Sequence, residues 1–283
     1  MATIEYMPAR LTPKETEDLR QAVACLEGAS FAQRLTDAVG RPVGMLSRAM
    51  PQSARRVIAH VSETALRSAL KLALRTLDLN ASARPANRAH KLAAAASGAV
   101  GGALGLAALP FELPISTTIL LRSIAEIARE EGEDLSAPAA AFACVEVFAL
   151  GGQGGGESAF ESGYFTVRAA LAKSVTDSAR FVAAQGVAAL PAPVVARLIS
   201  QIAARFGMVV SEKVAAQAAP ILGAIGGAAV NAAFADHFQT LARGHFIVRR
   251  LERQHGASVV AFEYQRLQGE RVREHAEGRR AAS

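Results

Sequence analysis

Aromatic residues are scarce in this sequence. Its 283 residues include no tryptophan, three tyrosines and 12 phenylalanines, although 51% of the residues are hydrophobic. Alanine and small aliphatic side chains therefore carry most of the apolar content. An all-β sandwich draws on aromatic and β-branched residues, so the composition argues against that fold. Intrinsic disorder of the whole chain is excluded as well, because it requires low hydrophobicity.

Cysteine is almost absent. The two cysteines, Cys25 and Cys144, are too few for a disulfide framework and fit no zinc-binding spacing. The first six residues have neither the basic start nor the long apolar run of a signal peptide, so we expect none. These features predict a protein of a reducing compartment, which places it in the cytoplasm.

The positive charge of the chain comes without the features of a nucleic-acid-binding module. The net charge is +6 and the sequence pI is about 9.8. Nucleic-acid-binding proteins interleave basic residues with exposed aromatics or show a known module, and neither pattern is present. We expect no nucleic acid partner, whereas an anionic lipid surface fits the charge. Many basic residues lie near the two ends of the chain: Arg10, Lys14, Arg20, Arg271, Arg273, Arg279 and Arg280.

Strand patterns are missing, and helical periodicity runs through almost the whole sequence. Thr12 and Glu15 have the spacing of a capping box, with Pro13 at the first helical position, so a helix should begin there. We predict an all-α protein, a single large helical bundle of about ten helices over residues 11–265. A basic, disordered tail should follow over residues 266–283. Apolar stripes predict further long helices over 54–77, 162–185, 192–208 and 227–254.

Two uncharged runs, residues 92–111 and 214–235, are as long as a membrane span. Glycine pairs at a spacing of four would let neighbouring helices approach closely, in lipid or in a protein core. Pro110, Pro114 and Pro220 interrupt the runs and favour short helices. Closely packed central helices of a soluble bundle and insertion into a bilayer both fit this pattern. The glycine pairs are Gly98 with Gly102, Gly101 with Gly105, and Gly223 with Gly227.

Several ionisable side chains fall where the pattern predicts a core. Glu146 has apolar neighbours throughout residues 141–150, so its carboxylate needs either a partner or a proton. Arg168 stands in an apolar stripe and is a candidate partner. Glu112 is a second carboxylate in apolar surroundings, and in the helix after it Arg122 lies one turn from an acidic residue.

Asn231 and His245 stand on the core-facing side of the last long helix, where they converge with the residues above into a predicted cluster. Three roles remain open for such a cluster. It could bind a metal through carboxylates and an imidazole, anchor a polar head group, or hold helices in register. The predicted buried polar cluster consists of Glu112, Arg122, Glu146, Arg168, Asn231 and His245.

Five blocks of sequence together resemble the bacterial EcsC family. They lie at residues 26–42, 110–125, 144–152, 220–231 and 245–252, within a resemblance that spans about residues 11–264. Each block alone is weak, whereas their combination is specific. The resemblance implies a helical bacterial protein on the cytoplasmic side, linked by the family name to an ABC exporter. It implies no assigned reaction, and most of the predicted cluster falls within the matching blocks.

Two functions from different classes follow as expectations. The first is a peripheral or amphitropic protein at the inner face of the cytoplasmic membrane, which binds anionic lipid or serves a membrane transporter. A variant of this function is an adaptor that docks on a transporter through its glycine faces. The alternative is a metal-assisted hydrolase whose pocket is lined by Glu112, Glu146 and His245. These three residues are the candidate catalytic groups and metal ligands. The first function needs no cofactor, and the hydrolase needs a divalent metal.

Overall fold

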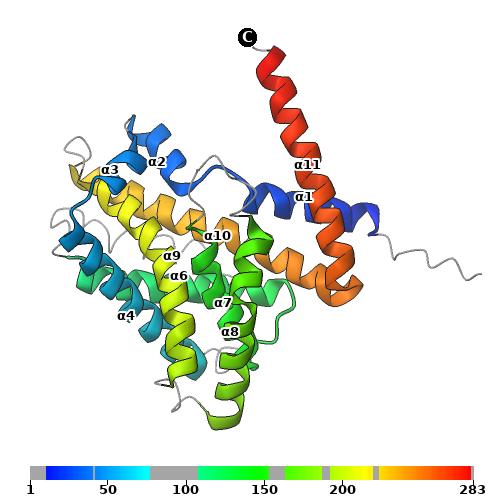
Figure 1. Cartoon of the computed structure of the whole chain (residues 1–283), viewed down its shortest axis with the longest axis horizontal. Coiled ribbons are helices and arrows are strands. Elements are labelled where there is room, and N and C mark those ends of the chain that lie inside the picture. The colour runs from blue at the N-terminus through cyan, green and yellow to red at the C-terminus, as the bar shows by residue number, and fades with distance from the viewer. Residues whose placement is uncertain are drawn as a thin grey trace, which may run out of the picture. The chain divides into compact units, whose positions relative to one another are not determined.

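The protein is all-α, as its periodicity predicts. A computed structural model describes residues 11–40, 42–76, 108–152, 163–186, 192–218 and 223–281, and this part of the chain contains ten helices and no strand (Figure 1). The predicted class and number of helices are therefore confirmed. The helices are α1 (Pro13–Leu26), α2 (Phe31–Val39), α3 (Val43–Arg48), α4 (Gln52–Thr76), α6 (Leu109–Glu130), α7 (Pro138–Leu150), α8 (Tyr164–Gln185), α9 (Pro193–Gln217), α10 (Gly223–His255) and α11 (Ala257–Ala281).

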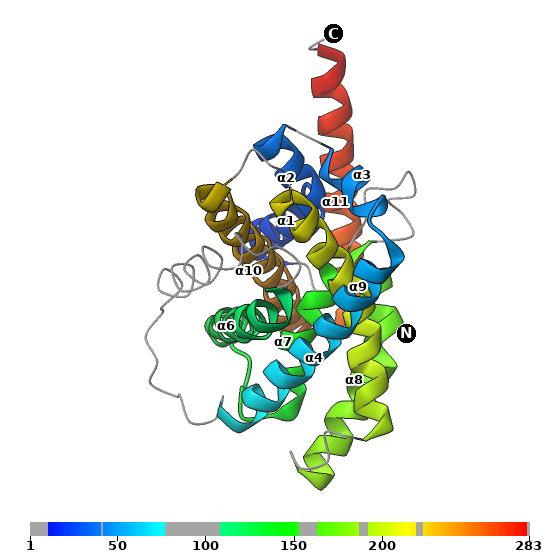
Figure 2. The same ribbon diagram turned by 90° about the vertical axis from the view of Figure 1, so that its left-hand side faces the viewer.

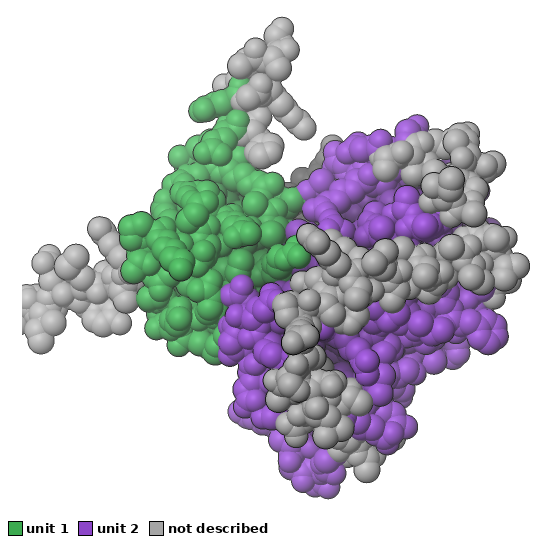
Figure 3. All heavy atoms as spheres, turned by 180° about the vertical axis from the view of Figure 1, so that it is seen from behind, with its two compact units in different colours: residues 1–28, 243–283 green, residues 29–242 purple. Residues whose placement is uncertain are grey.

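The chain divides into two compact units (Figure 3). Unit 1 combines residues 1–28 with residues 243–283, and unit 2 comprises residues 29–242. The 33-residue helix α10 contributes to both units, because the boundary falls after Ala242. The sequence predicts one domain over residues 11–265, and continuous apolar periodicity along α10 gives no sign of this division.

Helix α7 is the centre of unit 2. Its residues from Ala140 to Leu150 are all buried, and it packs against α4, α6, α8 and α9. A helix that is apolar on every side has no face to offer to water, so it must be enclosed by other helices. Glu146 lies within this buried stretch.

A cluster of phenylalanines connects the helices around α7. Neighbouring ring centroids in this cluster are 5.0 to 6.1 Å apart, within the range of favourable aromatic pairs. The cluster joins side chains from α2, α7, α9 and α10 in one place. Its members are Phe31, Phe148, Phe206, Phe234 and Phe238.

The two uncharged runs do not form continuous helices in the described part. The run 92–111 enters it only at residue 108, where Pro110 lies in the first turn of α6 and Pro114 inside that helix. The run 214–235 is shared between the end of α9 and the start of α10. Gly223 and Gly227 lie at the start of α10, whereas the predicted pairs within residues 98–105 fall outside the described residues.

Among the described helices, α9 alone is long and apolar enough to cross a membrane. Its most apolar window has a mean hydropathy of 1.4, and half of that window is buried in the protein. The central helix of a soluble bundle has the same properties, so this finding does not separate the two readings of the apolar runs.

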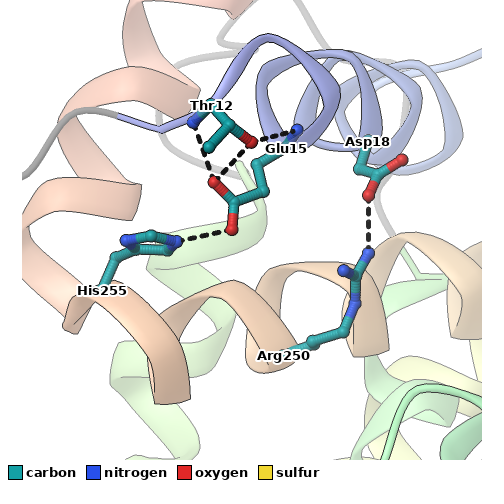
Figure 4. Close-up of polar contacts among 5 residues, drawn as sticks. All are labelled: Thr12, Glu15, Asp18, Arg250 and His255. Atoms are coloured by element: carbon teal, nitrogen blue, oxygen red, sulfur yellow. Dashed lines mark hydrogen bonds and ion pairs between the residues drawn. The ribbon is translucent and has the colours of Figure 1, made fainter.

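Polar contacts join α1 to the C-terminal part of α10 in unit 1 (Figure 4). The predicted capping box is confirmed, since Thr12 Oγ1 accepts from the Glu15 backbone and the Thr12 backbone donates to Glu15 Oε2 at 2.8 Å. Glu15 Oε1 also lies 2.8 Å from His255 Nε2, and Asp18 pairs with Arg250 at 2.9 Å. The hydrogen bond with His255, followed by those from Thr12, lowers the pKa of Glu15 to about 2.

The prediction of a disordered tail from residue 266 is wrong, because α11 continues to Ala281. Buried Val260, Tyr264 and Leu267 form a stripe at spacings of four and three, and the Tyr264 hydroxyl donates to Glu27 at 2.8 Å. Arg266 pairs with an acidic residue on each side along the helix. Charged side chains that pair one turn apart support a solvated helix, which composition alone does not distinguish from a tail.

Replacing Gly244 by alanine is expected to destabilise unit 1 by about 1–3 kcal/mol, because overpacking a close helix contact forces backbone shifts. A β-carbon at this position would lie 2.7 Å from Leu26 Cγ and 3.0 Å from the Ala22 carbonyl oxygen. Thermal unfolding measures the change. Gly269→Ala in α11 is the matched control, since nothing lies within 4 Å of its β-carbon position and helix propensity predicts a gain of up to about 1 kcal/mol. Equal melting temperatures for the two variants would contradict the close packing of α1 on α10.

Candidate functional site

A buried ion pair joins three helices of unit 2. Lys213 from α9 places Nζ 2.5 Å from Oε1 of Glu112 on α6, and Asn231 Nδ2 from α10 donates to the same oxygen at 3.1 Å. The Lys213 side chain is completely buried, with Nζ 4.9 Å from the centroid of the Phe234 ring. The ammonium therefore lies between a carboxylate and the face of an aromatic ring, both of which favour its charged form.

Burial and pairing act on Lys213 in opposite directions. Burial lowers the pKa of the Lys213 ammonium, and the charge and hydrogen bond of Glu112 oppose this change. Glu112 lies in the first turn of α6, where the helix dipole favours a negative charge. A buried pair of this kind holds its helices in one arrangement, because either charge left alone would be costly.

The structure brings together two of the predicted cluster residues, Glu112 and Asn231. Glu146 is buried in α7, and His245 is buried in unit 1 with its ring 4.9 Å from that of Phe246. Arg168 is half-buried, and its guanidinium lies 5.3 Å from the centroid of the Tyr164 ring.

Arg122 does not belong to the buried cluster. Its side chain is exposed on α6, so its inclusion among the inward-facing residues is wrong. The neighbouring positions Leu121 and Ser123 are buried. A helix turns by about 100° per residue, so Arg122 lies on the outer side of the same turn.

The structure does not form the predicted metal site. Within the described ranges, no group of three or more His, Cys, Asp or Glu side chains is placed to hold a metal ion. Glu112, Glu146 and His245 all lie in those ranges, so this candidate ligand set has no common centre there. Among the described residues, these three side chains therefore do not form the ligand set that a metal-assisted hydrolase would need.

Lys213 is the buried ionisable residue of this site that the sequence pattern did not predict. It occupies a position on the apolar stripe of α9 that continues from Phe206 through Val209 to Ala216. A lysine at that spacing is as misplaced as Glu146, and it is the signal that could have identified the partner of Glu112. Because Glu212 precedes Lys213, the two charged residues together resemble an exposed segment of the helix. This resemblance hides the fact that Lys213 points inward.

In unit 2, α2, α3 and α4 pack against α9 (Figure 2). A groove of about 750 Å³ is lined by residues of α2, α3, the beginning of α4 and the C-terminal half of α9. Its walls combine apolar side chains with charges of both signs. The groove lies on the outer side of the α9 segment that carries Lys213. Its apolar side chains include Ala32, Pro42, Met45 and Met208, and its charged ones are Asp37, Arg48, Arg55 and Glu212.

The carboxyl of Glu212 is one of the charged groups that line this groove. Burial raises the pKa of its carboxyl to about 7, against the opposing effects of a hydrogen bond from the Ala32 backbone and the charge of Arg48. Ala32 is in the first turn of α2, so the carboxyl occupies the positive end of that helix. At neutral pH this carboxyl therefore gains or loses a proton readily, a property that concentrates at functional sites.

The comparison with protein families covers nearly the whole chain. The EcsC protein family matches residues 4–251. The chain belongs to the EcsC protein family. No curated protein and no solved structure matches the chain. The EcsC match includes the buried pair, Asn231 and the groove, whereas α11 lies beyond its C-terminal limit.

Proposed function

We propose that this EcsC protein binds the surface of anionic membranes through α3 and the beginning of α4. The observation that carries the proposal is a concentration of exposed apolar and basic side chains on α3 and the first turns of α4. Met45 is 65% exposed and Val57 is 41% exposed, both unusual for apolar side chains of a folded unit. The surface consists of Met45, Leu46, Arg48, Arg55, Arg56 and Val57, and is called the α3–α4 surface below.

Such a surface suits the boundary between lipid head groups and acyl chains. Exposed methionine, leucine and valine side chains gain free energy when they enter the apolar layer, and arginines beside them meet lipid phosphates. Further basic residues, Arg67, Lys71 and Arg75, are exposed along α4, and Arg67 pairs with Glu63 at 2.8 Å. A membrane would thus meet exposed apolar side chains together with basic residues that outnumber the acidic one on α4. The inner face of the cytoplasmic membrane, rich in anionic lipid, is the matching location.

Reversing two charges of this surface is expected to weaken membrane binding at least about tenfold. Each basic residue near an anionic surface contributes about 1 kcal/mol, and about 1.4 kcal/mol corresponds to a factor of ten. The variant is Arg55→Glu with Arg56→Glu, and the measurement is flotation with phosphatidylglycerol-containing vesicles at low ionic strength. Met45→Ser should weaken binding too, with less dependence on salt, because it removes an apolar contact and leaves the charge unchanged.

The matched control changes the same amount of charge elsewhere in unit 2. Arg180 on α8 and Arg197 near the start of α9 are both exposed, and Arg180→Glu with Arg197→Glu should leave flotation almost unchanged. Melting temperatures show whether the variants remain folded. Equal losses for the two double variants would mean that binding follows net charge and not this surface. Wild-type protein that stays in solution beside anionic vesicles would refute membrane binding.

A further inference from the structure

The groove beside Glu212 opens on the α3–α4 surface. Met45, Arg48 and Arg55 line the groove and also belong to that surface. A molecule that enters the groove from a membrane would therefore not leave the lipid layer to do so. This continuity matters only if the surface meets a membrane, so the inference that follows rests on the proposed function.

The charges that line the groove are of both signs. Arg48 and Arg55 supply guanidinium groups, which bind phosphate oxygens well. Asp37 and Glu212 supply carboxylates in the same groove. A simple anion would be repelled by the two carboxylates, and a simple cation by the two arginines. A head group that carries a phosphate and an ammonium can satisfy both pairs.

The remaining walls suit the part of a lipid that joins head group and chains. Met208 on α9 and Met45 on α3 are both exposed and line the groove, as do Ala32 and Pro42. Methionine side chains adapt to flexible apolar ligands because they are unbranched and polarizable. Ser30 and Gln33 at the start of α2 add a hydroxyl and an amide to the lining. The lining of the groove thus combines two arginines, two carboxylates and several apolar side chains.

We infer that the groove binds the head group of an aminophospholipid, with its phosphate against Arg48 and Arg55 and its primary ammonium against Glu212 and Asp37. Ethanolamine phospholipid is the simplest molecule with this chemistry. The ammonium has three N–H donors to give to carboxylate oxygens, which a trimethylated amine lacks. The groove therefore discriminates by the amine as well as by the phosphate.

Binding should also release protons near neutral pH. Glu212 is half-protonated at about pH 7, and an ammonium beside it favours the ionised carboxylate. The charged groups around it are Arg48 on α3, Arg55 on α4 and Asp37 on α2, and the Ala32 backbone of α2 donates to it. Affinity for the amine lipid is expected to rise as the pH rises through 7, whereas a lipid without an amine would show the opposite trend.

The test is titration calorimetry of the full chain with short-chain lipids below their micelle concentration. Dihexanoyl phosphatidylethanolamine is expected to bind at least about tenfold more tightly than the phosphatidylcholine or phosphatidylglycerol of the same chain length. Glu212→Gln should remove this preference and the proton release, which is measured by comparing buffers of different ionisation enthalpy. Asp37→Asn provides a second variant in case Glu212→Gln alters the packing of α2. Glu130→Gln, at an exposed position on α6, is the control and should bind like the wild type.

The outcomes separate this inference from the proposed function. Vesicle flotation without any binding of monomeric ethanolamine lipid would overturn the groove assignment and leave membrane binding intact. Tighter binding of the glycerol lipid, or an unchanged preference in Glu212→Gln and Asp37→Asn, would overturn it as well. Binding of the monomeric lipid without flotation would support the groove and refute the α3–α4 surface as a membrane contact.

Discussion

Replacing Lys213 by methionine is expected to lower the free energy of unfolding by about 3–5 kcal/mol. This is the cost of removing one member of a buried pair and leaving the other charge without its partner. Methionine fills much of the space of the lysine stem, so the loss reports the charge and not a cavity. Glu112 would have to take up a proton beside Asn231, or recruit water into the aromatic cluster. Urea denaturation at neutral pH measures the change.

Two further variants give this expectation its controls. Lys173 on α8 is 89% exposed and pairs with Asp177 at 2.9 Å, so Lys173→Met should change the stability by no more than about 0.5 kcal/mol. Lys213→Met combined with Glu112→Leu should recover most of the loss, since no buried charge then remains. A loss in Lys213→Met that is no larger than that in Lys173→Met would contradict the buried pair. Failure of the double variant to recover would show that packing, and not charge, is the cause.

The second large effect concerns pH, where two buried groups of unit 2 act in opposite directions. The pKa of His237 is lowered from 6.5 to about 4 by burial and by the charge of Arg34, against smaller effects of the Gly151 backbone and Asp236. Its unfolded form takes up a proton first as the pH falls below 6.5, so His237 removes about 3 kcal/mol of stability by pH 4. Glu212 has the raised pKa of about 7, so its folded form keeps a proton that the unfolded form has lost above pH 4.5. It therefore removes about 2 kcal/mol of stability as the pH rises from 4.5 to 7, a value reduced for its partial exposure.

The wild-type stability is therefore expected to change little between about pH 4.5 and 6.5, where the two effects overlap. Glu212→Gln should be about 2 kcal/mol more stable than the wild type at pH 7 and should lose stability steeply as the pH falls. His237→Leu should show the reverse, with stability that increases on acidification. His60→Leu, at an exposed position on α4, is the control. Parallel pH profiles for all four proteins, from denaturation at a series of pH values, would contradict the assignment of either group.

Local signals made much of the fold predictable. The capping box at Thr12 fixes the start of α1 within its own four residues, and the stripes of α4 and α8 repeat over several turns. The end of the last helix was not predictable in this way. Its residues beyond Leu267 are mostly polar, and their helical state depends on contacts of α11 with α1 and on ion pairs one turn apart.

The candidate site was predictable only in part. Apolar neighbours mark Glu112 and Asn231 as inward-facing, and the two do meet. The burial of Lys213 was not predicted, because a lysine beside a glutamate on a helix resembles a solvated pair. Its partner, Glu112, also lies far away in the sequence. The groove could not be predicted at all, because α2, α3, α4 and α9 form it together and no one segment carries its pattern. The prediction that Arg122 is buried was wrong because the motif block that contains this residue does not indicate which side of α6 it occupies.

Glu212 and Lys213 are joined by a single peptide bond, yet one faces a groove that opens outward and the other is completely buried. That short stretch of α9 cannot shift for one residue and stay fixed for the other. A guest molecule that shifts this turn of α9 would also displace the ammonium that ties α6 and α10 together. We therefore expect the stability of the α6–α9–α10 packing in unit 2 to depend on what occupies the groove, without any hinge or moving loop.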